Sequence, residues 1–152
     1  KRSGMVMFFV INYYPNPKQL TCWDFKGSPE NIIDLIRSCG CKVGVSIKPK
    51  TPLSDIFPIL DKVDVVLVMS VEPGFGGQGY LPESSEKIAS IKSFLIENCL
   101  DRVLIEVDGG IKLHNAKSIL EAGADILVAG SEVFKSNDPA QTIKDFYKLS
   151  KW

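Results

Sequence analysis

The sequence contains one histidine, no Cys-x-x-Cys pair and no excess of charge of either sign, and each absence excludes a class of function. Lys plus Arg and Asp plus Glu each number 18, so the formal net charge is zero. Such a chain lacks the basic surface that nucleic acid or an anionic membrane would attract. The apolar run at 5–11 is far shorter than the about 20 residues that cross a bilayer. We therefore expect neither a nucleic-acid partner nor membrane association.

The cysteines and the histidine do not form a metal-binding set. Cys22, Cys39, Cys41 and Cys99 lack the spacing of a zinc site, and His114 is expected to face solvent in the first turn of a helix. We interpret the cysteines as reduced structural thiols, which predicts a cytoplasmic protein. With 45% hydrophobic and 24% charged residues, the 152-residue chain has the composition of one globular domain.

From residue 29 onward, strand-like runs alternate with helix-like stripes. Strands are expected at 43–47, 63–71, 103–107 (ending at Asp108) and 125–129, and helices at 29–39, 53–60, 83–97, 113–121 and from 138 onward. This alternation predicts an α/β fold with a parallel sheet, either doubly wound or part of a (β/α)₈ barrel. Residues 1–27 match the pattern poorly, although 5–11 and 19–25 have strand character. We expect one domain over 1–152.

Three glycine clusters follow successive predicted strands, at 72–79, 108–110 and 129–131. Ligands of parallel sheets bind at this edge, and glycines let backbone N–H groups approach an anion. Each glycine alone would be explained by a tight turn, but three clusters on one edge favour an anion site. The segment 74–79 matches G-x-G-x-x-G, yet its helix begins only near Glu83, which argues against a dinucleotide site. No Gly-Lys-Ser/Thr follows, so a P-loop is excluded.

Asp108 is the candidate for chemistry. Alternation along 103–108 places it on one strand face with Leu104 and Glu106, while the other face packs on helices. A carboxylate at the strand end can bind a metal, transfer a proton or cap the next helix. Glu106 lies one layer deeper and is interpreted as a hydrogen-bonded interior residue, near Ser46 or Lys48.

The sequence resembles the ribulose-phosphate 3-epimerase family over about residues 19–150. The stretch Val68-Met69-Ser70-Val71-Glu72-Pro73-Gly74-Phe75-Gly76-Gly77-Gln78 carries the resemblance, and 42–51, 105–111 and 122–134 resemble that family's fifth, seventh and eighth strands. Another phosphate-binding barrel enzyme, such as a thiamin-phosphate synthase, shares the glycine loops. The combination of 73–78 with 107–110 disfavours that alternative.

The resemblance implies a (β/α)₈ barrel and an isomerase of the pentose phosphate pathway. The family interconverts D-ribulose 5-phosphate and D-xylulose 5-phosphate by removing the proton at C3. One divalent metal ion, which is zinc, iron(II), manganese or cobalt, holds the oxygens of the enediolate, and one aspartate acts on each face. The implied partner of this chain is therefore a pentose 5-phosphate.

The resemblance also assigns roles to residues of this chain. Asp108 matches one of the two catalytic aspartates and a metal ligand. Met69, a core residue by composition alone, matches a methionine that lines the active site. The phosphate-binding residues would be Gly74, Phe75, Gly76, Gly77, Gly109, Gly110, Gly130 and Ser131, acting through backbone N–H groups with no lysine required.

The family's first half is not matched. The resemblance implies a serine on the first strand, a histidine and the second aspartate on the second, and a histidine on the third, and none of these is matched. On the fourth strand, Trp23 and Asp24 stand where the family has a histidine and a glutamate. A closed barrel needs about 200 residues or more. We therefore expect the C-terminal four to five βα units of a barrel, which form a homo-oligomer or pair with an N-terminal half. The alternative function is a non-catalytic half-barrel that retains only sugar-phosphate binding.

Overall fold

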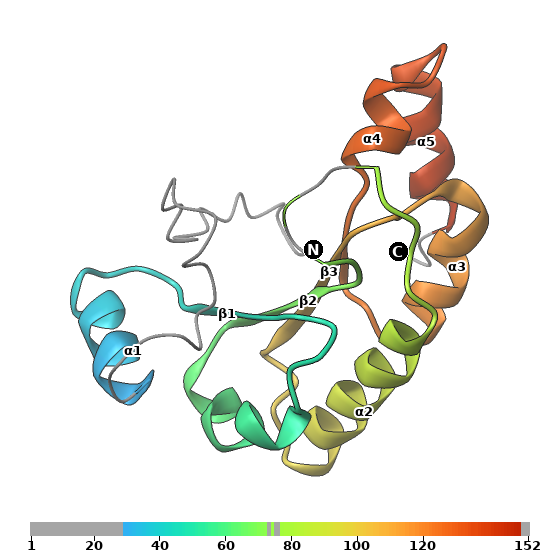
Figure 1. Cartoon of the computed structure of the whole chain (residues 1–152). Helices are drawn as coiled ribbons and strands as arrows, with labels where there is room; N and C mark the ends of the chain where they lie inside the picture. Colours follow the sequence, from blue (N-terminus) through green and yellow to red (C-terminus); the bar gives the residue numbers. More distant parts are fainter. Residues whose placement is uncertain (1–28, 73, 75–76, 150–152) are drawn as a thin grey trace.

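The computed structural model describes residues 29–72, 74 and 77–149 and confirms the alternation of strands and helices (Figure 1). The strands are β1 (Gly44–Ile47), β2 (Val65–Met69), β3 (Leu104–Asp108) and β4 (Ile126–Val128). The α-helices are α1 (Pro29–Ser38), α2 (Glu83–Glu97), α3 (Leu113–Glu121), α4 (Gly130–Phe134) and α5 (Pro139–Leu149). Two 3₁₀ helices, η1 (Leu53–Asp55) and η2 (Phe57–Lys62), connect β1 to β2. Within the described ranges, no helix has the length and apolar character needed to cross a membrane.

The order of the strands distinguishes between the two predicted architectures. All pairs are parallel, and the sheet runs β1-β2-β3-β4 in the order of the sequence. A doubly wound sheet reverses its order at a switch point, whereas a (β/α)₈ barrel does not. The sheet is therefore an arc of barrel type with four βα units. The possible strands at 5–11 and 19–25 lie outside the described residues.

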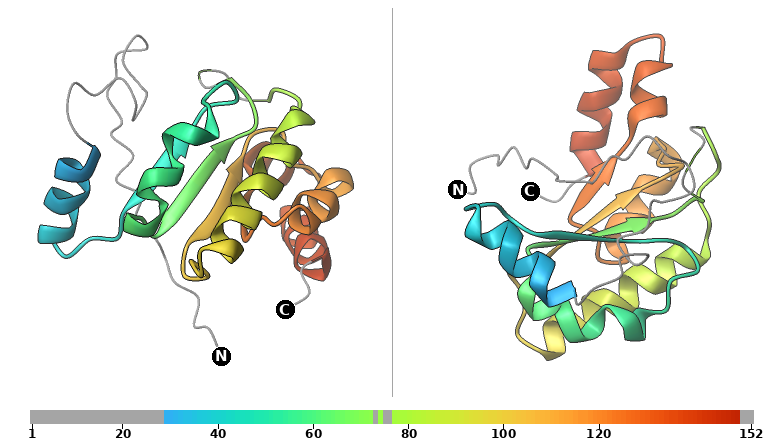
Figure 2. Two further views of the ribbon diagram at one scale, coloured as in Figure 1. Left: turned by 90° about the horizontal axis from the view of Figure 1, so that it is seen from below. Right: turned by 60° about the vertical axis from the view of Figure 1, so that its left-hand side comes forward.

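One face of the sheet is covered by helices, and the core lies there (Figure 2). Every second side chain of a strand points to this face, and the apolar stripes of the amphipathic helices pack against those side chains. One cluster joins Val45, Ile47, Val66, Val68, Ile105 and Val107 of the sheet to Ile56, which lies between η1 and η2, and to Ile33, Ile59, Leu60, Ile88, Ile91, Leu95 and Ile119 of the helical elements. Full burial of each such side chain contributes about 1.5–3 kcal/mol.

The opposite face presents its residues in rows across the strands. Ser46, Leu67, Glu106 and Ile126 are successive partners in the middle row, and Met69, Asp108 and Val128 are partners in the last row. Leu104, Glu106 and Asp108 therefore share the face away from the helix-side core, as predicted from alternation. In a barrel this face points to the interior.

The segment after β1 differs from the predicted helix at 53–60. It forms the two 3₁₀ helices, because Pro58 lacks the backbone N–H that a continuous α-helix over 53–60 would need and restricts Phe57 before it. Phe57 stacks on Phe94 of α2 with ring centroids 4.2 Å apart, which holds η2 against the helix layer. The predicted strand at 63–71 is shorter, since only Val65–Met69 pairs with β1 and β3.

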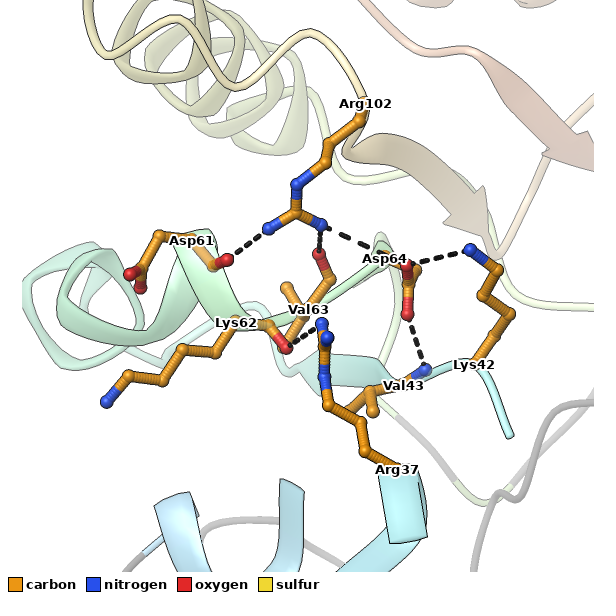
Figure 3. Close-up of polar contacts among 8 residues, drawn as sticks. All are labelled: Arg37, Lys42, Val43, Asp61, Lys62, Val63, Asp64 and Arg102. Carbon is orange, nitrogen blue, oxygen red and sulfur yellow. Dashed lines mark hydrogen bonds and ion pairs between the residues drawn. The ribbon is translucent and has the colours of Figure 1, made fainter. Parts of the chain in front are cut away.

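The amino-terminal edge of the sheet is held by Asp64 (Figure 3). Its Oδ2 accepts a hydrogen bond of 2.8 Å from Val43 N–H, and its Oδ1 lies 3.2 Å from Lys42 Nζ. Arg102 Nη1 is 3.9 Å from the same carboxylate and donates to Val63 O at 2.8 Å. Burial by itself would raise the pKa of Asp64, but the hydrogen bond from Val43 N–H and the positive charges of Lys42 and Arg37 lower it below its ordinary value. This edge, which is opposite the candidate site, serves stability.

Candidate active site

Met69 and Asp108 end two neighbouring strands and are direct register partners. Both side chains are half-buried, and they belong to the row that also contains Val128 of β4. The structure thus places the two predicted catalytic residues together at the carboxyl edge of the sheet. In barrel enzymes, this edge carries the chemistry.

Asp108 does not cap the following helix. The N-cap of α3 is Lys112, whose N–H donates to Asn115 Oδ1 at 2.8 Å. The Asn115 side chain also donates to Gly110 O at 3.0 Å, so it ties the helix to the turn before it. Helix capping was one of the three roles left open for Asp108, and this geometry excludes it.

The surroundings of Asp108 favour its protonated form. Burial raises the pKa of its carboxyl, and a hydrogen bond from the Gly109 N–H opposes that rise only in part. A carboxyl group with a raised pKa holds and releases a proton closer to neutrality than an exposed aspartate does. This property suits an acid/base group.

Ser70 fixes the backbone that carries Asp108. Its N–H donates to Asp108 O at 2.8 Å, and its fully buried Oγ lies 2.9 Å from Asp108 O and 2.6 Å from Gly109 O. The one hydroxyl proton can be shared between these two carbonyls. The Ser70 carbonyl accepts from Leu81 N–H at 3.0 Å, so the same residue also anchors the end of the glycine-rich loop.

Gly109 and Gly110 form a turn that other residues could not form. Their φ angles are +119° and +63°. A Cβ on Gly109 would lie 2.6 Å from a methyl carbon of Val71, and a Cβ on Gly110 would lie 2.7 Å from the Gly79 carbonyl carbon and closer still to Tyr80 N. The two glycines thus pack against the loop after β2, and this close packing is a structural reason for glycine at both positions. Their contact with a phosphate group stays a prediction.

Glu106 differs from its predicted state. Its side chain is 5% exposed, and its Oε2 has no hydrogen-bond partner within the described ranges. Ser46 belongs to the same row, but Leu67 lies between them, so the interpretation of Glu106 as a satisfied interior residue was wrong. Burial first, and then the negative charge of Asp108, raise the pKa of Glu106 to about 7.

The other predicted phosphate-binding residues come from two loops. Gly74 and Gly77 are exposed in the loop after β2, and Gly130 and Ser131 are exposed in the first turn of α4, after β4. Phe75 and Gly76 lie outside the described residues. The first-turn N–H groups of a helix lack intrahelical acceptors and are therefore available to other partners.

Sequence reasoning missed a lysine that anchors the loop after β1. Lys87 of α2 donates from Nζ to the carbonyls of Lys48, Pro49 and Thr51 at 3.2, 2.6 and 2.7 Å. This loop leaves the same carboxyl edge as Asp108. A lysine among helix surface residues carries no sequence signal for such a contact, because its three acceptors are backbone atoms.

The described residues do not by themselves form a metal site. No group of three or more His, Cys, Asp or Glu gathers anywhere in them. His114 is exposed on α3, as predicted, and Asp108 and Glu106 are the acidic residues of the inner face of β3. One strand-end carboxylate is fewer than the three protein ligands that zinc sites use.

The parallel sheet in sequence order, with a carboxylate and glycine turns at its carboxyl edge, defines a protein of the α/β-barrel class. A family model described as "Ribulose-phosphate 3 epimerase family" matches residues 23–134. The chain belongs to the ribulose-phosphate 3-epimerase family, as its sequence motifs predicted.

Relatives support the same assignment. Ribulose-phosphate 3-epimerase of Escherichia coli (strain K12) is 41% identical over 116 residues, which cover 76% of this chain and 51% of the relative. The protein of that name from Buchnera aphidicola subsp. Baizongia pistaciae (strain Bp) is 44% identical over 142 residues, covering 93% and 58%. The chloroplastic ribulose-5-phosphate-3-epimerase of Arabidopsis thaliana is 47% identical over 112 residues, covering 74% and 40%. The chain spans about half the length of the curated relatives it matches.

Solved structures support the fold. A crystal structure of 3-hexulose-6-phosphate synthase superposes with a TM-score of 0.55 at 18% identity, covering 78% of this chain and 54% of that chain. The synthase from Salmonella typhimurium gives 0.51 at 19% identity, covering 79% and 54%. At this identity the likeness concerns the fold alone. It agrees with the barrel-type order of the strands.

Proposed function

We propose that this chain carries the C-terminal half of a ribulose-phosphate 3-epimerase site, which interconverts D-ribulose 5-phosphate and D-xylulose 5-phosphate in the cytoplasmic pentose phosphate pathway. The observation that carries the proposal is the register pairing of Asp108 with Met69 at the carboxyl edge, beside the Gly109–Gly110 turn. The proposed reaction is taken from the family to which the chain belongs. Asp108 and Met69 have side chains that suit this reaction.

In this proposal Asp108 is the acid/base group on one face of the intermediate. It removes the proton at C3, next to the C2 ketone, or returns it. Its raised pKa suits this role, because a base closer to neutral pH binds the proton more readily than an ordinary aspartate. Ser70 keeps the strand end in place, and Met69 supplies an apolar neighbour that limits access of water to the intermediate.

The phosphate group would be bound by backbone N–H groups of the loops after β2, β3 and β4. These are the candidate residues Gly74 to Gly77, Gly109–Gly110 and Gly130–Ser131. Barrel enzymes frequently bind phosphate at the loops that follow strands seven and eight. The segments 105–111 and 122–134, which resemble those two strands of the family, contain the ends of β3 and β4.

For the metal, we propose Asp108 as a ligand, and within the described residues it is the only one we assign. The described residues provide no set that fits a divalent ion, so we derive no step through it. The same observation favours a second candidate function, in which the chain alone binds a sugar phosphate without turnover. A complete site would then require a homo-oligomer or an N-terminal half from another chain.

The experiment purifies the chain, determines its mass in solution and assays conversion of ribulose 5-phosphate with added zinc, manganese or iron(II). The assay is repeated after co-expression with the N-terminal half of the Escherichia coli relative. We expect no family-like turnover from a monomer of this chain and epimerisation from the co-expressed assembly. A stable assembly without epimerisation would overturn the proposal, and an active monomer would overturn the requirement for a second half.

A further inference from the structure

Lys135 brings a positive charge to the edge of the sheet that holds the candidate site. It is the C-cap residue of α4, and its backbone N–H donates to Ser131 O at 3.1 Å. Its Nζ lies 4.0 Å from the point that a Cβ on Gly77 would occupy. Gly77 belongs to the loop after β2, whereas Lys135 follows β4. The lysine therefore extends from the segment that begins at Gly130–Ser131 to the glycine-rich loop.

The ammonium group of Lys135 is not neutralised by a protein carboxylate. Within residues 29–72, 74 and 77–149, the lysines with ion pairs are Lys42, Lys62, Lys92, Lys117 and Lys148. Glu132, an acidic residue of the same helix, accepts a hydrogen bond from Leu113 N–H at 3.4 Å. The charge of Lys135 thus remains available to a ligand.

Lys135 also differs from the lysine that serves the loop after β1. All three N–H groups of Lys87 can be used by backbone carbonyls, which explains that lysine as a structural contact. A lysine at a helix C-terminus often contacts the last carbonyls of its own helix. Lys135 Nζ makes no such hydrogen bond in the part of the chain that the structure describes, and it lies at another loop instead.

We propose that Lys135 binds the phosphate group of the substrate opposite Gly77, so that the phosphate site combines backbone N–H groups with one ammonium group. An ammonium group paired with backbone donors favours a phosphate monoester in its dianionic form, because both contribute donors and neither contributes an acceptor. The same arrangement disfavours a cation or a neutral sugar. This inference rests on the proposed function, and it adds a side chain to a site that was predicted to need no lysine.

The test measures binding of inorganic phosphate and of ribulose 5-phosphate to the 152-residue chain by calorimetry. The variants are Lys135→Met, Lys135→Arg and, as a matched control, Lys144→Met, which removes an exposed lysine of α5. We expect Lys135→Met to weaken binding of both ligands about tenfold, as removal of one charge-assisted hydrogen bond does. Lys135→Arg should retain most of the affinity, and Lys144→Met should leave it unchanged.

The pH dependence provides a readout that a structural role would not change. The second ionisation of a phosphate monoester has a pKa of about 6, so affinity of the unaltered chain should increase as the pH rises through this value. Lys135→Met should lose most of this increase while its circular dichroism spectrum stays unchanged. Equal affinity of Lys135→Met and the unaltered chain would overturn the inference alone. No binding of either ligand by the unaltered chain would overturn the phosphate site of the proposed function with it.

Discussion

Met69 at the end of β2 and Asp108 at the end of β3 are direct partners in the parallel register of the sheet. The two residues were predicted from different segments of the sequence, and the fold places them in one row of the sheet. The backbone of Asp108 is held from the same side, because Ser70 follows Met69 directly and donates to Asp108 O. A change at the end of β2 is therefore expected to affect the position of the carboxylate on β3.

Asp108→Asn is expected to lower epimerisation at least about 100-fold when the chain is assembled with the N-terminal half of a relative. Asparagine keeps the size of the side chain but cannot take up the proton from C3. Steady-state turnover of ribulose 5-phosphate measures the loss. Unfolding by urea should show unchanged stability. If turnover stayed close to that of the unaltered assembly, Asp108 would not be the acid/base group of the reaction.

Gly110→Ala is expected to destabilise the chain by about 2–4 kcal/mol, since the alanine would be strained at a φ of +63° and its Cβ would collide with Gly79 and Tyr80. Gly79→Ala is the matched control, because no atom lies within 4 Å of its Cβ position and its φ is not in the left-handed range. Urea unfolding compares the two variants. Equal stabilities would contradict the packing described for this turn.

Glu106→Gln is expected to change how stability depends on pH. The carboxyl titrates near 4.5 when unfolded and at about 7 when folded, so the folded chain binds more protons between these values. The free energy of unfolding therefore falls as the pH rises from about 4.5 to about 7. Each unit of pKa difference corresponds to roughly 1.4 kcal/mol of unfolding free energy. Glu106→Gln removes the titrating carboxyl, so the variant should not lose this stability as the pH rises. Denaturation at pH 5 and pH 8 tests this, and parallel pH profiles for the two proteins would refute it.

Asp64→Ala is expected to cost about 1–3 kcal/mol, because it leaves the Val43 N–H without its acceptor. The lowered pKa of Asp64 means that its contribution is present above the unfolded pKa and is lost as the pH falls through the folded pKa. The difference between variant and unaltered chain should thus shrink in strong acid. Asp61→Ala serves as the control, since only the backbone carbonyl of Asp61 contacts Arg102 (Figure 3). A pH-independent difference would contradict the assignment.

Local patterns predicted two of the helices and the strand face on which Asp108 lies. The bounds of α2 and α3 agree with the predicted ranges 83–97 and 113–121, since each has an apolar stripe and a clear end. Strand alternation placed Asp108 on the inner face because its period is two. These features depend on neighbours within a few residues.

Contacts between distant segments could not be predicted in the same way. The choice between a doubly wound sheet and a barrel required the strand order, which alternation does not encode. The contacts of Lys87 with three carbonyls and of Ser70 with the Asp108 turn join segments more than 30 residues apart. Glu106 was predicted to be hydrogen-bonded because buried polar atoms usually are. Whether a buried carboxylate has a hydrogen-bond partner depends on residues distant in the sequence. Only the structure shows that Glu106 Oε2 has none among the described residues.

We expect the carboxyl edge that carries Asp108 to bind the sugar phosphate. The most direct measurement is an NMR titration of the ¹⁵N-labelled chain with ribulose 5-phosphate, with Gly130→Val as the variant in which a bulky side chain obstructs the phosphate. We predict that titration shifts the amide signals of Gly109, Gly110, Gly130 and Ser131 but not those of Val43 and Asp64 at the amino edge. Gly130→Val should weaken this response. Shifts confined to the amino edge, or an unchanged response in Gly130→Val, would contradict it.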